Sequence, residues 1–127
     1  MIAVDTSALI AVVLGEATAA ACMAALEADD RVLISAGTLA QALIDSQLRN
    51  VMAEVAGIVE KLAFEIAPVT AGTARRVAQA YARWGKGQHP AGLNFGDCFA
   101  YAVAKEHRCR LLYVGKDFAR TDIESVL

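Results

Sequence analysis

MIAVDTSALIAVVL, residues 1–14, is the stretch that decides the fold. Met1 to Val4 is a short apolar run typical of a buried strand, and an apolar helical run from Ala8 to Leu14 follows almost at once. The three residues between them, Asp-Thr-Ser, are all good helix N-caps. Asp5 therefore stands at the carboxyl end of a predicted strand and at the start of a predicted helix.

The same alternation of short strands and helices continues along the chain. Further strands are predicted at Arg31 to Ser35, Phe64 to Val69 and Arg110 to Val114, and Pro68 indicates an edge position for the second of these. Further helices are predicted at Glu16 to Ala28, Thr38 to Arg49, Val51 to Ala63, Thr70 to Trp84 and Phe95 to His107. This order predicts an α/β fold in which helices cover both faces of a parallel sheet.

Length and composition limit the possible classes of protein. A chain of 127 residues predicts a single domain over residues 1–127, and a net charge of −2 gives no general affinity for nucleic acid, which would have to be held by local patches, a cation or a partner. No run reaches the roughly 20 apolar residues of a membrane span, and no basic leader segment is present, so a cytoplasmic location is expected. The three cysteines, Cys22, Cys98 and Cys109, are expected to be reduced thiols.

Three isolated aspartates carry the chemistry. Asp5 follows the first strand, Asp97 lies in the first turn of a helix capped by Asn94, and Asp117 follows the last strand. Ligands of open α/β sheets bind outside the carboxyl ends of the strands, where these carboxylates are expected to converge. Their mutual repulsion is relieved by a hard divalent cation such as Mg²⁺ or Mn²⁺. Taken singly, each aspartate also has an ordinary interpretation as a helix cap or a turn residue.

Three segments, in this order and spacing, resemble the PIN-domain ribonucleases, and more narrowly the VapC toxins of type II toxin–antitoxin pairs. They are V-D-T-S-A-L at Val4 to Leu9, L-N-F-G-D-C-F-A-Y-A-V-A-K at Leu93 to Lys105, and L-L-Y-V-G-K-D-F-A-R-T-D-I at Leu111 to Ile123. The resemblance implies a three-layer α/β/α sandwich with a central parallel sheet of four to five short strands. It also implies RNA cleavage dependent on Mg²⁺ or Mn²⁺ held by Asp5, Asp97 and Asp117, a homodimer, and inhibition by a small antitoxin.

One position departs from the family pattern. The family has a glutamate in the helix after the second strand, and the matching segment here, S-A-G-T-L-A-Q-A-L, places Gln41 there. Glutamine keeps the shape and a carbonyl oxygen but carries no charge, so weaker metal affinity and lower activity are expected. Asp45 lies one turn later on the same helical face. Natural divergence, compensation by Asp45 and an engineered inactivation are the explanations that the sequence leaves open.

The remaining candidate residues are auxiliary. Thr6 and Ser7 are candidates for orienting water or a carboxylate, with helix capping as the alternative role. Asp122 is a weaker acidic candidate in the same loop as Asp117. The basic residues expected near the mouth of the site, as contacts for RNA phosphates, are Lys86, Lys116 and Arg120.

Other functions fit the sequence less well. A phosphoaspartate receiver needs an acidic pair after the first strand and an aspartate after the middle strand, where this chain has Asp5 alone and Thr70. A haloacid-dehalogenase-type phosphatase needs D-x-D, where this chain has D-T-S. The second serious hypothesis is a catalytically impaired binding module that keeps antitoxin and RNA binding, with the apolar helices of residues 16–28 and 38–63 forming a groove for a partner helix.

Overall fold

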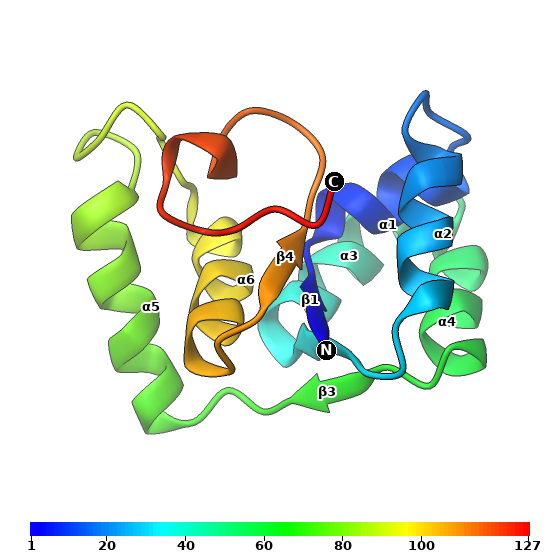
Figure 1. Cartoon of the computed structure of the whole chain (residues 1–127), viewed down its shortest axis with the longest axis horizontal. Coiled ribbons are helices and arrows are strands. Elements are labelled where there is room, and N and C mark those ends of the chain that lie inside the picture. The colour runs from blue at the N-terminus through cyan, green and yellow to red at the C-terminus, as the bar shows by residue number, and fades with distance from the viewer.

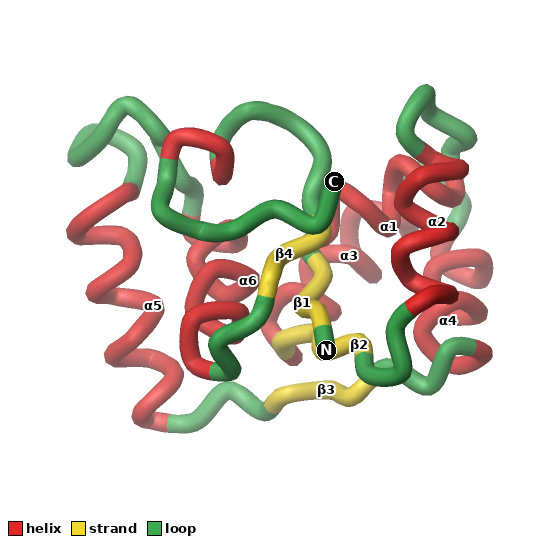
Figure 2. The backbone as a smooth tube through the Cα atoms, viewed as in Figure 1, coloured by secondary structure: helices red, strands yellow, loops and turns green.

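A four-stranded parallel sheet lies at the centre of the molecule, as seen in the computed structural model, which describes residues 1–127 (Figure 1, Figure 2). Its strands are β1 (Ile2–Val4), β2 (Val32–Ser35), β3 (Glu65–Ala67) and β4 (Arg110–Leu112), in the spatial order β3-β2-β1-β4. Every pairing is parallel, so all four carboxyl ends meet at one edge of the sheet. The predicted fold class is confirmed, and β3 lies at an edge as Pro68 indicates.

Six helices cover the two faces of the sheet. They are α1 (Thr6–Val13), α2 (Ala19–Ala28), α3 (Ala36–Leu48), α4 (Met52–Lys61), α5 (Ala71–Trp84) and α6 (Phe95–Glu106). Figure 1 shows α5 and α6 on one side of the strands and α1, α2 and α4 on the other, with α3 behind the strands, and Ala42 of α3 belongs to the same core as residues of α1, α2 and α4. The alternation of side chains along β1 explains both layers, because Ile2 and Val4 enter the core under α1 to α4 while Ala3 enters the core under α5 and α6.

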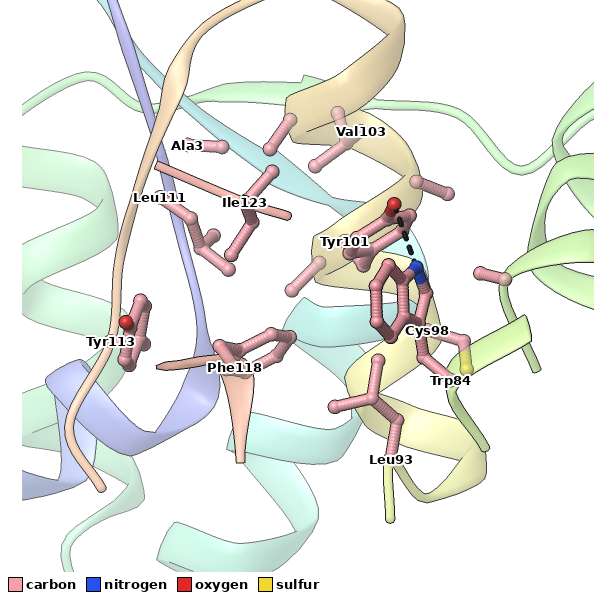
Figure 3. Close-up of a cluster of buried hydrophobic side chains, with 14 of the residues drawn as sticks. Ala3, Trp84, Leu93, Cys98, Tyr101, Val103, Leu111, Tyr113, Phe118 and Ile123 are labelled. Carbon is pink, nitrogen blue, oxygen red and sulfur yellow. Dashed lines mark hydrogen bonds between the residues drawn. The ribbon is translucent and has the colours of Figure 1, made fainter. Parts of the chain in front are cut away.

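The larger of the two cores holds the carboxyl-terminal tail in place (Figure 3). The indole Nε1 of Trp84 donates a hydrogen bond to Tyr101 Oη at 3.0 Å, and the Tyr101 hydroxyl donates one to Asp122 at 2.5 Å. Asp122 also forms an ion pair with Lys105 at 3.2 Å. Beyond it, the backbone N–H of Leu111 in β4 donates to the carbonyl of residue 124 at 2.9 Å. The tail is therefore bound to α5, α6 and the sheet rather than loose.

Several helix boundaries differ from the prediction, among them the start of α1 at Thr6 instead of Ala8, and two further differences have clear local reasons. Helix α2 begins at Ala19 and not at Glu16, because Gly15 has a φ of 64° and turns the chain sharply after α1. Helix α3 begins at Ala36, two residues earlier than predicted, because the Ser35 hydroxyl accepts a hydrogen bond from a backbone amide of the first turn. Both differences arise at caps, where several neighbouring residues are chemically able to begin a helix.

The cysteines are unpaired, as the sequence predicts. Cys22 and Cys98 are buried and Cys109 is half-buried, and none forms a disulfide. Each helix is too short or too polar to span a lipid bilayer.

Candidate active site

A polar cavity of about 330 Å³ lies at the carboxyl edge of the sheet, between α1, α3 and the first turn of α6. Its lining comes from segments that are far apart in the sequence. The lining residues are Asp5, Thr6, Ser7, Ile10, Glu16, Gln41, Asp45, Arg49, Asp97 and Val114. Six of the residues predicted from the sequence therefore share one cavity, which is where an open α/β sheet is expected to bind its ligand.

Asp5 is the most deeply buried acid of the cavity, with 4% of its surface exposed. It caps α1, and its Oδ2 accepts hydrogen bonds from the backbone N–H of Ser7 at 3.0 Å and from the Ser7 hydroxyl at 2.7 Å. Its Oδ1 is buried and has no hydrogen-bond partner. Burial is the main cause that raises the pKa of Asp5, and the charge of Asp117 acts in the same direction. One oxygen of Asp5 is therefore available for a ligand.

Ser7 and Thr6 fix the backbone around Asp5. The Ser7 hydroxyl also accepts a hydrogen bond from the backbone N–H of Val114 at 3.0 Å, which ties the start of α1 to the loop after β4. The Thr6 hydroxyl donates to the carbonyl of Thr38 in α3 at 3.3 Å. Strand β4 ends at Leu112, two residues before its predicted end at Val114. The backbone N–H of Val114 bonds to the Ser7 hydroxyl instead of to a neighbouring strand.

Asp97 lies in the first turn of α6 and is half-buried. Asn94 caps the helix as predicted and forms a capping box with Asp97, since Asp97 N–H donates to Asn94 Oδ1 at 2.8 Å and Asn94 N–H donates to Asp97 Oδ2 at 3.0 Å. Burial raises the pKa of Asp97 to about 6, and the charges of Asp5 and Asp117 add to this effect. Asp97 thus has a structural role and an electrostatic cost at the same position.

Gln41 extends from α3 onto the first turn of α6. A Cβ atom placed on Gly96 would lie 2.1 Å from Gln41 Oε1, so the side chain rests directly on the glycine backbone. The absence of a side chain at Gly96 therefore lets Gln41 reach the cavity beside Asp97. Asp45, one turn further along α3, lines the same cavity. The expectation that Asp45 reaches toward the site agrees with this placement.

Asp117 lies in the exposed loop after β4 and does not line the cavity. Its charge nevertheless raises the pKa of both Asp5 and Asp97, which places it within electrostatic range of the pair. Asp122 belongs elsewhere, because its carboxylate is bound to Tyr101 and Lys105 under the tail. The structure does not bring Asp122 to the cavity.

The basic residues predicted from the sequence lie outside the cavity. Lys86, Lys116 and Arg120 are all exposed, and none of them lines it. Arg120 instead donates a hydrogen bond to the carbonyl of Pro90 at 3.1 Å. Lys86 and Lys116 lie in loops and Arg120 ends a short 3-10 helix (Phe118–Arg120), and no periodic pattern in the sequence shows which way these side chains point.

Two charged lining residues were not predicted as part of the site. Arg49 is the C-cap residue directly after α3 and stands eight residues after Gln41, so the four-residue spacing of Gln41, Asp45 and Arg49 was a signal that could have found it. Glu16 lies in the turn after α1, where no periodic pattern marks its direction.

The donor set suits a hard divalent cation. As the side chains stand, no group of three His, Cys, Asp or Glu residues is placed to hold an ion. Mg²⁺, however, is usually held by one or two carboxylates together with water molecules. Asp5, with its unpartnered buried oxygen, Asp97 and the amide oxygen of Gln41 provide oxygen donors of this kind in one cavity. The residues present therefore fit the expected cation.

The sequence is similar to known proteins over nearly its whole length. A family profile described as the PIN domain matches residues 2–124. Ribonuclease VapC28 of Mycobacterium tuberculosis is 44% identical over 128 residues, which cover 98% of this chain and 96% of the relative. Ribonuclease VapC36 of the same organism is 43% identical over 127 residues, with 95% and 90% covered.

Solved structures show the same fold at lower identity. Mycobacterium tuberculosis VapC20, described as a sarcin–ricin loop cleaving toxin, matches with a TM-score of 0.80 at 19% identity and covers 99% of this chain and 98% of its own. A toxin–antitoxin complex from Klebsiella pneumoniae matches with a TM-score of 0.73 at 21% identity, with 96% and 93% covered. By its family profile and its relatives, this chain belongs to the PIN-domain family and, within it, to the VapC group.

Proposed function

We propose that this protein is a metal-dependent endoribonuclease, the toxin of a VapBC-type pair, and that the cavity at the carboxyl edge of the sheet is its active site. The observation that carries the proposal is the buried, unpartnered Oδ1 of Asp5 in the same polar cavity as Asp97. RNA is the proposed substrate because relatives up to 44% identical are named ribonucleases.

Each residue of the site has a proposed task. Asp5 and Asp97 hold Mg²⁺ or Mn²⁺, Gln41 offers its amide oxygen, and Asp117 adds a third carboxylate from the loop after β4. When bound, the cation would lower the pKa of a water molecule that acts as the nucleophile and would offset charge on the phosphate. Ser7 keeps Asp5 Oδ2 engaged, which leaves the unpartnered Oδ1 as the oxygen proposed to bind the cation.

Gln41 is proposed to lower the metal affinity and the activity. A glutamate at this position would place a further negative charge beside Asp5 and Asp97, whereas the amide is neutral. Asp45 carries a charge one turn away and is proposed to offset part of this loss.

Removal of either carboxylate tests the proposal. We expect Asp5→Asn and Asp97→Asn to lower cleavage of single-stranded RNA in Mn²⁺ by about 100-fold or more, because each removes charge that the site needs. Asp30→Asn is the matched control, since Asp30 is exposed and lies outside the cavity. Cleavage that survives Asp5→Asn in the presence of a chelator would contradict the proposal.

The proposed partners are a small antitoxin and a second copy of the chain. One solved neighbour is described as a toxin–antitoxin complex, and another as VapBC2 bound to a DNA fragment from its promoter. Near the α3–α4 connection this chain exposes three large apolar side chains, Ile44 by 57%, Leu48 by 79% and Met52 by 44%, which is a surface suited to an apolar partner segment. Co-expression with the product of any short open reading frame found beside the gene for this chain, followed by purification through a tag on that product, tests the pairing.

The homodimer is proposed to use the opposite side of the molecule. A groove of about 450 Å³ between α5 and α6 is lined by eight apolar residues, among them Phe95, which is 70% exposed. Light scattering of the purified chain and of Phe95→Asp tests this, with a dimer expected only for the unmodified protein. A cytoplasmic location is proposed along with this function.

The alternative function is a binding module with impaired catalysis, and Gln41 is the observation that favours it. Cleavage by Gln41→Glu but not by the unmodified chain would support the alternative. Cleavage by both would support the enzyme.

A further inference from the structure

Arg49 is the only cationic side chain among those that line the acidic cavity. Four carboxylates line the same cavity, those of Asp5, Glu16, Asp45 and Asp97. Arg49 nevertheless takes part in none of the five ion pairs of the structure. Its guanidinium is thus free to bind a ligand that enters the cavity.

Helix α3 sets the position of Arg49 relative to the acids. Gln41 and Asp45 lie one turn apart on one face of α3, Arg49 follows four residues later as its C-cap, and all three line the cavity. Eight residues of helical rise place Arg49 about 12 Å along the axis from Gln41. One end of the cavity is therefore marked by Gln41, which contacts the start of α6, and the other end by Arg49, the single cation.

The backbone at this end of α3 is well fixed. Asn50 has a left-handed φ of 59°, and its N–H donates to the carbonyl of Gln47 at 3.1 Å. The N–H of Val51 donates to the carbonyl of Ser46 at 2.8 Å, and Ser46 is fully buried. The side chain of Arg49 is exposed on this rigid base. Little backbone entropy is lost when such a residue binds a ligand.

We infer that Arg49 binds a phosphate of the RNA strand that flanks the phosphate to be cleaved, and thereby fixes the register of the strand across the cavity. This inference rests on the proposed function. The planar guanidinium presents paired N–H donors that match two phosphate oxygens. The carboxylates of the cavity repel the phosphates of an RNA strand. The single cation, Arg49, attracts a phosphate at one end of the cavity, so the strand is expected to lie along α3 with one of its phosphates at that end. The basic residues predicted from the sequence do not line the cavity and leave this task to Arg49.

The test measures RNA binding rather than cleavage. All variants carry Asp97→Asn to prevent cleavage, and the probe is a fluorescein-labelled single-stranded RNA followed by anisotropy. We expect Arg49→Ala to weaken binding about 5- to 10-fold and to lower the slope of log K against log salt by about 0.7, the value for one phosphate contact on a single strand. The RNA affinity of Arg49→Lys should lie between those of the protein with Arg49 and of Arg49→Ala, because lysine keeps the positive charge but lacks the paired N–H donors of the guanidinium.

Arg75→Ala is the matched control. Arg75 is exposed on α5, takes part in none of the ion pairs and does not line the cavity. We expect its affinity and salt slope to stay at the starting values. Equal effects of Arg49→Ala and Arg75→Ala would overturn the inference, because they would show a general loss of positive charge.

A neutral backbone substitution locates the contact. RNAs that carry one methylphosphonate, placed in turn at each position, lack one negative charge each. At the phosphate that Arg49 binds, we expect Arg49→Ala to have no further effect, and an effect that persists at every position would overturn the inference. Cleavage by the chain without Asp97→Asn is assayed separately. Cleavage without a specific effect of Arg49 would reject only this inference. Specific binding without cleavage would reject only the proposed enzyme activity, and absence of RNA binding would reject both.

Discussion

The carboxyl group of Asp97 serves α6 and the cavity at the same time, and the two roles have opposite energetic signs. Its hydrogen bond with the Asn94 amide stabilises the start of the helix, whereas burial and the charges of Asp5 and Asp117 disfavour its ionised form. The net result is a pKa of about 6, above the ordinary 3.8. A raised pKa of a carboxyl group means that the folded state binds the proton more tightly than the unfolded state does.

This sign gives a prediction for the metal-free protein. Between pH 3.8 and about 6 the folded state holds more protons, so the free energy of unfolding falls as the pH rises through this window. Asp97→Asn keeps an acceptor for the capping box and has no charge, so it should be more stable than the unmodified chain at pH 7 by about 1 to 2 kcal/mol, allowing for solvent screening. Urea unfolding in EDTA from pH 3.5 to 7.5 measures this. A difference in the free energy of unfolding between Asp97→Asn and the unmodified chain that stays constant from pH 3.5 to 7.5 would contradict this prediction.

Gln41→Glu should have opposite effects without and with metal. The added carboxylate joins Asp5 and Asp97 in one cavity, so without metal the melting temperature should fall by a few degrees, about 1 kcal/mol for a chain of this size. With Mn²⁺ it should rise by more than that of the unmodified chain, because a tighter site stabilises the folded state further. Thermal unfolding with and without Mn²⁺ measures both.

Gln47→Glu is the control for this substitution. Gln47 lies on the same helix, is exposed, and does not line the cavity. The melting temperature of Gln47→Glu should therefore differ little from that of the unmodified chain, with or without Mn²⁺. Equal shifts for the two variants would show that the effect belongs to the charge of α3 and not to the cavity.

At the scale of elements, the strands were easier to predict than the caps. The central strands β1 and β2 are short runs of buried, mostly β-branched and aliphatic residues next to turn signals, and the edge strands β3 and β4 lie within their predicted segments but are shorter. Helix starts were less certain because Ser35 and Thr38 are both able to cap α3, and only the hydrogen bond to Ser35 decides between them. The contact between α3 and α6 brings Gln41 to Asp97, and it depends on Gly37 and Gly96. The sequence alone does not show that these two glycines face the neighbouring helix.

The two helical glycines Gly37 and Gly57 provide a matched test of helix packing. A Cβ on Gly37 in α3 would meet the ring of Phe99 at 2.5 Å, whereas a Cβ on Gly57 in α4 has no atom within 4 Å. We expect Gly37→Ala to destabilise the protein by about 1 to 3 kcal/mol through overpacking against α6. Gly57→Ala should stabilise it by about 0.5 to 1 kcal/mol through higher helix propensity. Chemical denaturation of both variants measures the difference, and two changes of the same sign would contradict this account of the α3–α6 contact.

At the scale of the whole molecule, the cavity depends on segments from both layers of helices. Asp5 and Gln41 come from the side of α1 and α3, and Asp97 comes from α6 on the other side of the sheet. The sequence predicted Asp5 and Asp97 because each follows a recognisable strand or cap. Asp122 was misplaced because the sequence does not show that Tyr101, one core residue among many, would bind its carboxylate. The direction of a side chain in an irregular tail is set by long-range contacts, which local patterns do not contain.

The bond between Tyr101 and Asp122 is expected to hold the tail against the second layer. Burial and the hydrogen bond to Asp122 raise the pKa of Tyr101 to about 12, so the hydroxyl remains a donor at all physiological pH values. Asp122→Ala removes this charged acceptor and the ion pair with Lys105, and should lower the free energy of unfolding by about 2 kcal/mol. Glu124→Ala, in the same exposed segment, should change it by less than about 0.5 kcal/mol, since only the backbone of residue 124 bonds to Leu111.

Hydrogen exchange shows whether this loss is local to the tail. In Asp122→Ala the amides of Leu111 and Val126, which bond to the tail and to β4 respectively, should exchange faster than those of β1 and β2, because the tail opens without unfolding of the sheet. In Glu124→Ala both amides should keep their protection. Equal protection in the two variants would mean that the apolar contacts of Phe118 and Ile123 hold the tail on their own, and that the buried hydrogen bond of Tyr101 contributes little to closing this side of the molecule.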